Sequence, residues 1–407
     1  MAFVLLISLA SIPSYLEPGQ AEPTVPAGFN INVFYPGLTD PTSMTWGPDG
    51  NLYVSQQSGE IIELVIGIDG FPMGSALIAK VPPTLLGLVF VGQDLFVSYT
   101  GGVDRLNLQN GKASSQQTVL SGLPHGRHQN DEIVYGKDGF LYLGIGSTGD
   151  RTNGNDPQSA TIVRFKPDGS SFEVFAKGLR NPYGLAFDKD GNLFSTDNGP
   201  DDPVGPDELN YIVQGGDYGF PNYFGTPPSG SGTIAPVVNL QGHSSSDGFT
   251  FYYGFEFPVE YVGNVFIAQW GANTSDPNIG RRVVMVPLTR SDHGFVGQED
   301  VFATGFDHPI DIIEDHEGGL LVADYGSGVI YRISYTLSQT AVSTQSTAII
   351  TVASNVASPA IQPYFTPALL LLIAAAALGV GAMLIRRRDK KAARRTKDPR
   401  QQGSQGI

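Results

Sequence analysis

GRHQNDEIVYGKDGFLYLGIGSTGD, residues 126–150, joins a Lys-Asp-Gly turn to an apolar stretch and a glycine-rich exit. Apolar residues that alternate after such a turn predict a β-strand. His128 precedes that strand in a polar setting, and a neutral imidazole there is a candidate general base because its unperturbed pKa lies near neutrality. A histidine that only bonds to its own loop is the other interpretation. The remainder of the chain has to decide between the two.

The turn and the strand that follows it form a unit that recurs between residues 25 and 333. Its copies occupy residues 48–56, 91–99, 136–146, 188–199, 261–271 and 315–326. Their central residues are 43, 46, 52, 72 and 55 positions apart in succession. A second strand is expected after most copies, at Glu60–Ile66, Gly102–Leu108, Thr161–Phe165, Arg282–Pro287 and Val329–Ile333.

A strand-rich repeat of about 40 to 50 residues with Asp-Gly turns is typical of a β-propeller blade. The copies therefore predict an all-β, six-bladed β-propeller, since single blades bury their faces only when the ring closes. A pair of β-sandwiches does not account for so many similar units. The long fourth interval contains residues 201–246, and we expect loops there above the blades, where such a scaffold places its functional site.

The composition excludes whole classes of function. The 407 residues include no cysteine, so disulfides, thiolate metal sites and cysteine nucleophiles are ruled out. The net charge is −15, but residues 386–407 carry nine Lys or Arg and two Asp or Glu, which leaves −22 on residues 1–385. So acidic a body repels a phosphate backbone and argues against nucleic-acid binding. It suits calcium or an uncharged substrate.

Both ends of the chain predict a protein that is exported and anchored in a membrane. Residues 1–21 are mostly apolar and end in a small-x-small pattern, which predicts a signal peptide or, alternatively, an N-terminal apolar strand. Residues 334–367 are rich in Ser and Thr and are expected to form a stalk. Residues 368–385 are uncharged and just long enough for one transmembrane helix. The basic residues 386–407 follow, which predicts a cytoplasmic tail and a propeller outside the cell membrane.

Specific motifs accompany the repeats. His128-Gln129 precedes GKDGFLYLGIG, and GLRNPYGLAFDKDGNLFSTDNGPDD (178–202) and DELNYIVQGGDYGFPNYFG (207–225) follow. These segments resemble the six-bladed soluble glucose/sorbosone dehydrogenases, quinoprotein aldose sugar dehydrogenases that use pyrroloquinoline quinone (PQQ) and calcium. The Leu-Arg-Asn-Pro and Gly-Asp-Tyr-Gly-Phe-Pro segments are specific, whereas Asp-Gly-x-Leu-Tyr is generic to propellers. The resemblance covers residues 26–333 and implies a sugar oxidoreductase.

The resemblance implies a role for each matching residue. His128 matches the base that takes a proton from the anomeric hydroxyl of an aldose while hydride passes to PQQ, which yields the lactone. Arg180 matches a guanidinium that stabilises the reduced quinone oxygen. His308 stands where the family often has an arginine, which weakens the expected capture of the three cofactor carboxylates. The residues expected to contact the cofactor are Gln129, Asn181, Asn198, Arg281 and Arg282.

Calcium is expected in one or two places. The resemblance implies that the backbone carbonyls of Gly199 and Pro200 hold the ion that polarises the quinone, and such oxygen ligands suit a hard cation. Asp207 and Glu208 belong to a cluster of carboxylates in the long fourth interval. That cluster is either a second calcium site or a solvated acidic loop.

Two residues outside these motifs have mainly structural interpretations. His243 has no suggestive partner in the sequence and is expected at the surface. Trp270 follows the fifth repeat at its polar exit. It either stacks on a sugar or packs between blades, and the second interpretation is the commoner one for a buried aromatic ring.

Three functions compete. The first is a membrane-anchored, outward-facing PQQ-dependent dehydrogenase that passes electrons from a sugar substrate to a membrane or extracytoplasmic acceptor. The second is a calcium-dependent lactonase-like hydrolase, whose metal would be held by carboxylates converging on the central channel and not gathered in one loop. The third is a non-catalytic surface propeller that binds glycans or proteins. The ordered set of His128, Arg180-Asn181 and Asn198–Pro200 favours the dehydrogenase.

Overall fold

The computed structural model describes residues 22–336, except for residues 110, 202, 203, 273–275, 277 and 293. The predicted signal peptide, nearly all of the predicted stalk, the predicted transmembrane helix and the basic tail lie outside these residues. Within the part of the chain that is described, no helix is long and apolar enough to cross a membrane.

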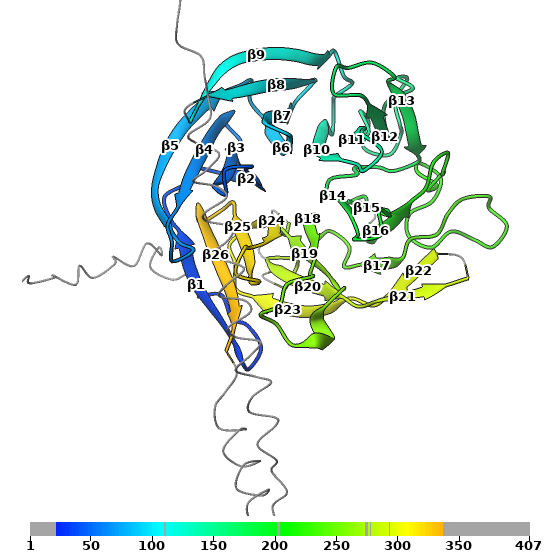
Figure 1. The fold of residues 1–407 in the computed structure, drawn as a ribbon. Helices are drawn as coiled ribbons and strands as arrows, with labels where there is room; N and C mark the ends of the chain where they lie inside the picture. The colour runs from blue at the N-terminus through cyan, green and yellow to red at the C-terminus, as the bar shows by residue number, and fades with distance from the viewer. Residues whose placement is uncertain are drawn as a thin grey trace, which may run out of the picture. The chain divides into compact units, whose positions relative to one another are not determined.

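The described residues form six four-stranded sheets arranged as blades around one axis (Figure 1). Blade 1 consists of β2 (Pro41–Trp46), β3 (Leu52–Gln56), β4 (Glu60–Ile66) and β5 (Pro72–Lys80). Blade 2 consists of β6 (Leu85–Val91), β7 (Asp94–Tyr99), β8 (Gly102–Gln109) and β9 (Lys112–Ser121). Blade 3 consists of β10 (Asn130–Tyr135), β11 (Leu141–Ile145), β12 (Thr161–Phe165) and β13 (Glu173–Lys177).

The next two blades are longer in sequence. Blade 4 consists of β14 (Leu185–Phe187), β15 (Leu193–Asp197), β16 (Asp207–Ile212) and β17 (Val238–Leu240). Blade 5 consists of β18 (Ser246–Phe251), β19 (Val265–Gln269), β20 (Arg282–Val286) and β23 (Asp300–Thr304). It also carries the short 3-10 helix η1 (Val259–Tyr261) and the hairpin of β21 (Leu288–Ser291) and β22 (Gly294–Gly297).

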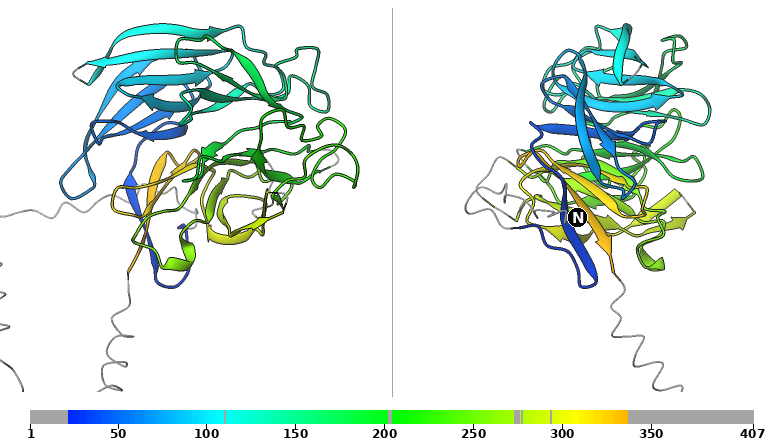
Figure 2. Two further views of the ribbon diagram at one scale, coloured as in Figure 1. Left: turned by 45° about the vertical axis from the view of Figure 1, so that its right-hand side comes forward. Right: turned by 60° about the vertical axis from the view of Figure 1, so that its left-hand side comes forward.

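Blade 6 joins the two ends of the described chain. It consists of β24 (Pro309–Glu314), β25 (Leu320–Asp324), β26 (Val329–Tyr335) and, as its outer strand, β1 (Phe29–Tyr35). β1 runs antiparallel to β26 with Phe29 opposite Tyr335, and Figure 2 shows the two strands side by side. Backbone hydrogen bonds between the first and last strands therefore close the ring, which confirms the six-bladed propeller.

The predicted second strands match the structure closely. β4 and β12 have the predicted bounds, whereas β20 ends at Val286, one residue before the predicted end. Pro287 has no backbone N–H and cannot continue a ladder. In blades 1, 3, 4, 5 and 6, the strand next to the innermost one is buried at every position; these strands are β3, β11, β15, β19 and β25. Both faces of these strands are covered because each blade packs between two neighbours.

Antiparallel pairing decides where the functional loops meet. In each blade, the start of the innermost strand lies beside the end of the strand that follows it in sequence. In blade 3, for example, Asn130 of β10 pairs with Ile145 of β11. The segments before β10, β14 and β18 and those after β11, β15 and β19 therefore emerge at the same end of the propeller. His128, Arg180 and Asn198 all belong to these segments.

Candidate active site

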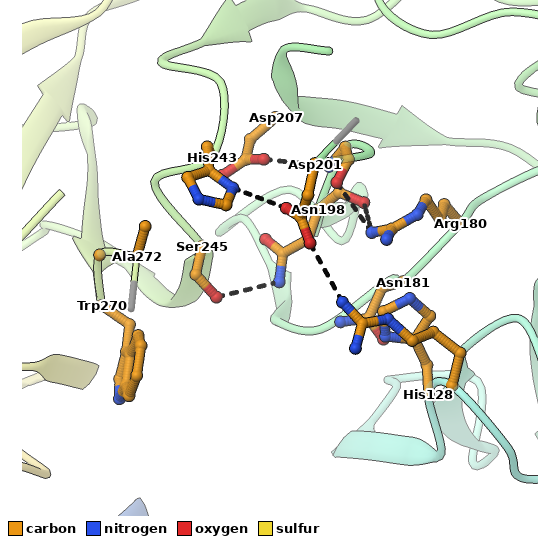
Figure 3. Close-up of a pocket in the computed structure, with 13 residues that line it drawn as sticks. His128, Arg180, Asn181, Asn198, Asp201, Asp207, His243, Ser245, Trp270 and Ala272 are labelled. Carbon is orange, nitrogen blue, oxygen red and sulfur yellow. Dashed lines mark hydrogen bonds and ion pairs between the residues drawn. The ribbon is translucent and has the colours of Figure 1, made fainter. Parts of the chain in front are cut away.

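A cavity of about 430 Å³ opens at this end of the propeller, among the loops of blades 3, 4 and 5 (Figure 3). This volume is within the range of small-molecule sites. The cavity is lined by Arg127, His128, Arg180, Asn181, Asn198, Gly199, Asp201, Asp207, His243, Ser245, Trp270, Gly271 and Ala272. The fold thus brings together the predicted base His128, the guanidinium of Arg180 and the amides of Asn181 and Asn198.

Three lining residues each carry a buried polar atom that has no hydrogen-bond partner among the described residues. These atoms are Nε2 of His128, Oδ1 of Asn181 and Oδ1 of Asn198. Unpaired buried polar atoms are rare in native proteins because each costs about 1–3 kcal/mol. A Cβ at Gly146 would lie 2.4 Å from Cβ of His128 and 2.6 Å from Oδ1 of Asn181, so these two residues flank a position that only glycine fits. The residues that line the cavity therefore include acceptors that the described residues leave unused.

Backbone hydrogen bonds fix these residues to one another across two blades. The N–H of His128 donates to the carbonyl of Ser147 at 3.1 Å, and the N–H of Ser147 donates to the carbonyl of Arg180 at 2.7 Å. The N–H of Asn198 donates to the carbonyl of Asn181 at 3.2 Å. The relative positions of the side chains are thus set by the backbone, and ligand binding does not have to create them.

His128 is held in its neutral form. Burial lowers its pKa to about 3, and the guanidinium groups of Arg180 and Arg127 add to the effect. Its imidazole therefore keeps a lone pair at every physiological pH.

Arg180 is 3% exposed, and its donors are used inside the protein. Its Nη1 donates to the carbonyls of Asn198 and Gly199 at 2.9 and 2.8 Å. Its Nε and Nη2 donate to the carbonyl and the carboxylate of Asp150 at 2.9 and 2.6 Å. The guanidinium therefore supplies positive charge to the cavity and fixes the turn that follows β15.

The predicted calcium carbonyls are both engaged in this turn. The carbonyl of Gly199 accepts from Arg180, and the carbonyl of Pro200 accepts from the N–H of Gly205 at 2.8 Å. The N–H of Gly199 donates to Oδ1 of Asp207 at 3.0 Å. A carbonyl has two lone pairs, so one hydrogen bond leaves room for a second partner.

His243 is partly exposed, as 25% of its side chain is accessible, but it has a partner that the sequence does not suggest. It lines the cavity, and its Nδ1 lies 2.7 Å from Oδ1 of Asp201, whose Oδ2 accepts from Nη2 of Arg127 at 3.1 Å. These three residues belong to loops of three different blades. Trp270 also lines the cavity, and its ring lies 4.1 Å from that of His308, so it contacts the site as well as the next blade.

A sequence profile of the family described as Glucose / Sorbosone dehydrogenase matches residues 98–332, which include every residue that lines the cavity. The chain belongs to this family. An uncharacterized protein of Borreliella burgdorferi is 27% identical over 373 residues, which cover 80% of this chain and 94% of that protein. Quinoprotein glucose dehydrogenase B of Acinetobacter calcoaceticus is 26% identical over 288 residues, 54% of this chain and 58% of that enzyme.

The fold of the family is also seen in a solved structure. The PQQ-bound form of an aldose sugar dehydrogenase from Streptomyces coelicolor superposes with a TM-score of 0.62, covering 77% of this chain and 100% of that chain at 22% identity. At this identity the likeness concerns the fold. It agrees with the six blades found in this chain.

Three residues that the family resemblance suggests for the cofactor, Gln129, Arg281 and Arg282, lie outside the cavity lining, and the first and last of these are bound firmly elsewhere. The Nε2 of Gln129 donates to Oδ1 of the buried Asp131 at 2.6 Å. The guanidinium of Arg282 donates to Oε1 of Gln269 at 2.6 Å and to Oε1 of Glu299 at 2.7 Å. Both side chains have structural partners within their own blades.

Arg281 is held more loosely than Arg282. Its Nη2 lies 3.4 Å from Nε2 of His308, and its Nη1 lies 3.9 Å from Oδ1 of Asp307. Its Nε is buried without a partner among the described residues, and its φ of 53° is in the left-handed region. Because the ring of His308 contacts that of Trp270, which lines the cavity, this guanidinium lies next to the cavity wall.

The expectation that Asp207 and Glu208 lie in an acidic loop is wrong, because both begin the buried strand β16. Neighbouring residues of a strand point to opposite faces, so their carboxylates diverge. Asp207 accepts from Gly199 and Ser246, and burial raises its pKa to about 6. Glu208 accepts from the N–H of Gly225 at 2.6 Å. Among the described residues, no group of three or more His, Asp or Glu side chains is placed to hold a metal.

Proposed function

We propose that this chain is a PQQ-dependent dehydrogenase that oxidises an aldose at C1 to the lactone, with His128 as the general base. The carrying observation is that Nε2 of His128 bonds to none of the described residues and belongs to a side chain that lines a cavity together with a buried guanidinium. Abstraction of a proton from a sugar hydroxyl requires a fixed lone pair within reach of that hydroxyl. The lowered pKa of His128 keeps this lone pair free.

The relatives support PQQ as the oxidant. One is named a quinoprotein glucose dehydrogenase, and another was solved as a PQQ-bound aldose sugar dehydrogenase. The cavity fits such an anionic group, since Arg127 and Arg180 in its lining supply positive charge. PQQ supplies the hydride acceptor when bound. Its anionic carboxylates would offset the two guanidiniums and raise the pKa of His128 toward the range of an effective base.

The residues of the chain have separate tasks in this proposal. His128 accepts the proton at Nε2, while the backbone bond to Ser147 keeps the ring in place. Arg180 stabilises negative charge through its field, because its donors are bound to Asp150 and to two carbonyls. Asn181 and Asn198 offer Oδ1 atoms that orient the bound groups.

Calcium fits the turn after β15 as a ligand of oxygen atoms. The carbonyl of Gly199 keeps one free lone pair beside its bond to Arg180, and none of the described residues bonds to Oδ1 of Asn198. Neutral oxygens of this kind suit a hard cation that completes its shell with cofactor or water oxygens. The ion would polarise the oxidant, so its removal should abolish turnover.

The sequence outside the described residues suggests where the enzyme works. The uncharged residues 368–385 and the basic residues 386–407 are the basis for proposing a single-pass anchor with the propeller outside the cell membrane. An anchor of this kind would keep the site near a membrane-associated electron acceptor.

Reconstitution tests the function directly. Purified full-length chain is incubated with PQQ and calcium, and reduction of an artificial electron acceptor is followed with a panel of aldoses. We expect aldose-dependent reduction that a calcium chelator removes. His316→Ala is the matched control, since His316 stacks on Trp46 away from this cavity. A folded protein that binds no PQQ and reduces no acceptor would overturn the proposal and leave the non-catalytic surface propeller and the calcium-dependent lactonase-like hydrolase.

A further inference from the structure

The end of the propeller opposite the cavity carries exposed apolar side chains, called here the apolar tips. They are Ile68, which is fully exposed, and Val259, Phe255 and Met73, which are 83%, 80% and 76% exposed. No other large apolar residue in the described part of the chain exceeds 60%. The apolar tips lie in the turn between β4 and β5, at the start of β5, and between β18 and β19. These connections are at the far end because the cavity loops precede the innermost strands and follow the second ones.

The segment between β18 and β19 is firmly held, so the exposure of its apolar tips is a feature of the folded backbone. Oη of the buried Tyr252 donates to the carbonyl of Gly318 at 2.6 Å and accepts from the N–H of Phe257 at 2.8 Å. The rings of Tyr252 and Phe257 stack with their centroids 4.4 Å apart, and both are buried. A segment fixed in this way loses little conformational entropy when Phe255 and Val259 are covered by a partner.

The chain leaves the propeller beside this segment. β26 ends at Tyr335, whose N–H donates to Oε1 of Glu256 at 3.2 Å, and Oε2 of Glu256 accepts from Nη2 of Arg332 at 2.8 Å. Glu256 follows Phe255 directly, and Figure 2 shows the segment with η1 beside the end of β26 in both views. The uncharged residues 368–385, proposed above as an anchor, thus belong to a chain that departs next to the apolar tips.

The charges around the apolar tips restrict the kind of surface that they fit. Asp69, Glu260 and Glu317 are exposed carboxylates of the same connections or of the turn between them. A Cβ at Gly70 would lie 3.2 Å from Cγ of Glu317, so the turns of blades 1 and 6 are in contact. Carboxylates repel an anionic head-group layer, so the attraction has to come from apolar area that leaves water.

We propose that the apolar tips rest on a lipid surface of low negative charge, so that the propeller stands on the membrane with its cavity facing away. The proposal rests on the anchor in the proposed function, which brings the bilayer within reach. Residues 337–367 extend to at most about 110 Å, so they alone position the propeller only loosely. Each tip that leaves water strengthens the contact about tenfold. Sugar and electron acceptor then approach the cavity from the side away from the bilayer.

A single label measures this orientation, because the chain has no cysteine of its own. Full-length Val259→Cys and Asn155→Cys are labelled with a polarity-sensitive fluorophore and reconstituted in phosphatidylcholine vesicles. Asn155 is exposed and lies between β11 and β12, at the cavity end. We expect a blue shift and quenching by nitroxide lipids at position 259 but not at 155, and weaker quenching when anionic lipid is added. No quenching at 259, or equal quenching at both positions, overturns the proposal.

A release test measures the strength of the contact. A protease site is placed within residues 337–367 of the full chain, which is reconstituted and then cleaved. The Ile68→Ser/Phe255→Ser/Val259→Ser variant should bind the vesicles at least 100-fold more weakly than the wild-type propeller after cleavage. Val174→Ser/Val301→Ser is the matched control, since these valines are 42% and 53% exposed on the outer strands β13 and β23. Equal binding of the variant and the control overturns the proposal.

Other outcomes separate this contact from the proposals on which it depends. A chain that alkaline carbonate strips from the vesicles, but whose label at 259 is quenched beforehand, contradicts only the anchor. Quenching at 259 in a protein that reduces no acceptor contradicts only the dehydrogenase. Val259→Cys that cross-links to a second chain in vesicles, without quenching by lipid, assigns the apolar tips to a contact between copies and overturns the proposal.

Discussion

The two sides of the cavity are held in different ways. On the side of blades 3 and 4, Arg180 is buried and makes bonds of 2.6–2.9 Å to Asp150, Asn198 and Gly199. On the side of blades 5 and 6, Arg281 makes longer contacts: its Nη2 lies 3.4 Å from Nε2 of His308, and its Nη1 lies 3.9 Å from Oδ1 of Asp307. The guanidinium of Arg180 therefore holds the surrounding backbone in place, whereas that of Arg281 keeps donors available for a ligand.

This difference separates two demands on a catalytic pocket. Groups that act on the reacting atoms have to be fixed before the substrate arrives, because rates depend on geometry. Groups that select a ligand need free donors and acceptors. We infer that blades 3 and 4 carry the chemistry and that blades 5 and 6 recognise what is bound. The predictions below test this division.

The largest difference is expected between the two arginines. Arg180→Ala leaves the buried carbonyls of Asn198 and Gly199 without a donor and should lower the free energy of unfolding by about 3 kcal/mol. Arg281→Ala removes only long contacts of a partly exposed side chain and should cost less than about 1 kcal/mol. Chemical denaturation of both variants measures this. Similar losses would show that the two sides do not differ in rigidity.

His128→Ala should remove most of the activity without unfolding the protein. Loss of a general base lowers kcat/KM by about 100-fold or more, which corresponds to about 2.7 kcal/mol. The measurement is aldose-dependent acceptor reduction at saturating PQQ and calcium, with His316→Ala as control. If His128→Ala stays active, another residue is the general base, and the assignment of the chemistry to blades 3 and 4 is wrong.

Acid stability should reveal the dry environment of His128. Its pKa is about 3 in the folded chain and 6.5 in the unfolded chain, so between these values only the unfolded chain binds the proton. The free energy of unfolding therefore falls as the pH is lowered through this window. His128→Asn removes this titration. Between pH 7 and pH 5 its free energy of unfolding should therefore fall by about 2 kcal/mol less than that of the wild type. Equal losses in both proteins would mean that His128 is hydrated.

The sequence predicted the repeating part of this fold, because each turn and strand is a local signal. The pairing of β1 with β26 was not predicted, since FNINVFY lacks the repeat's turn and its partner lies about 300 residues away. The same limit applies to the site. Arg180 and Asn198 occur in recognisable motifs, but His243 meets Asp201 only because blades 4 and 5 are neighbours.

The acidic residues show a second limit. Asp207 and Glu208 look like part of a loop, because their neighbours in sequence are Pro, Gly and Asp. In the structure they begin β16, where Asp207 accepts from the backbone of Gly199 and from Ser244 and Ser246. A composition rule cannot separate a solvated carboxylate from one that accepts three buried donors, because that depends on tertiary neighbours.

The smallest expected effect concerns the loosely held side. His308 occupies the place where the family resemblance suggests an arginine, and it lies between Trp270 and Asp307. His308→Arg adds a guanidinium beside Arg281, with Asp307 present to offset the like charge. It should strengthen PQQ binding about fivefold, or about 1 kcal/mol, as expected for one more charge-assisted contact to a carboxylate. His308→Gln, which adds no charge, is the matched control, and both are measured by absorbance titration of PQQ at fixed calcium. Weaker binding of His308→Arg would show that the imidazole itself belongs to the cofactor site. In that case the side of blades 5 and 6 would be as specialised as the opposite side, although it is less tightly bonded.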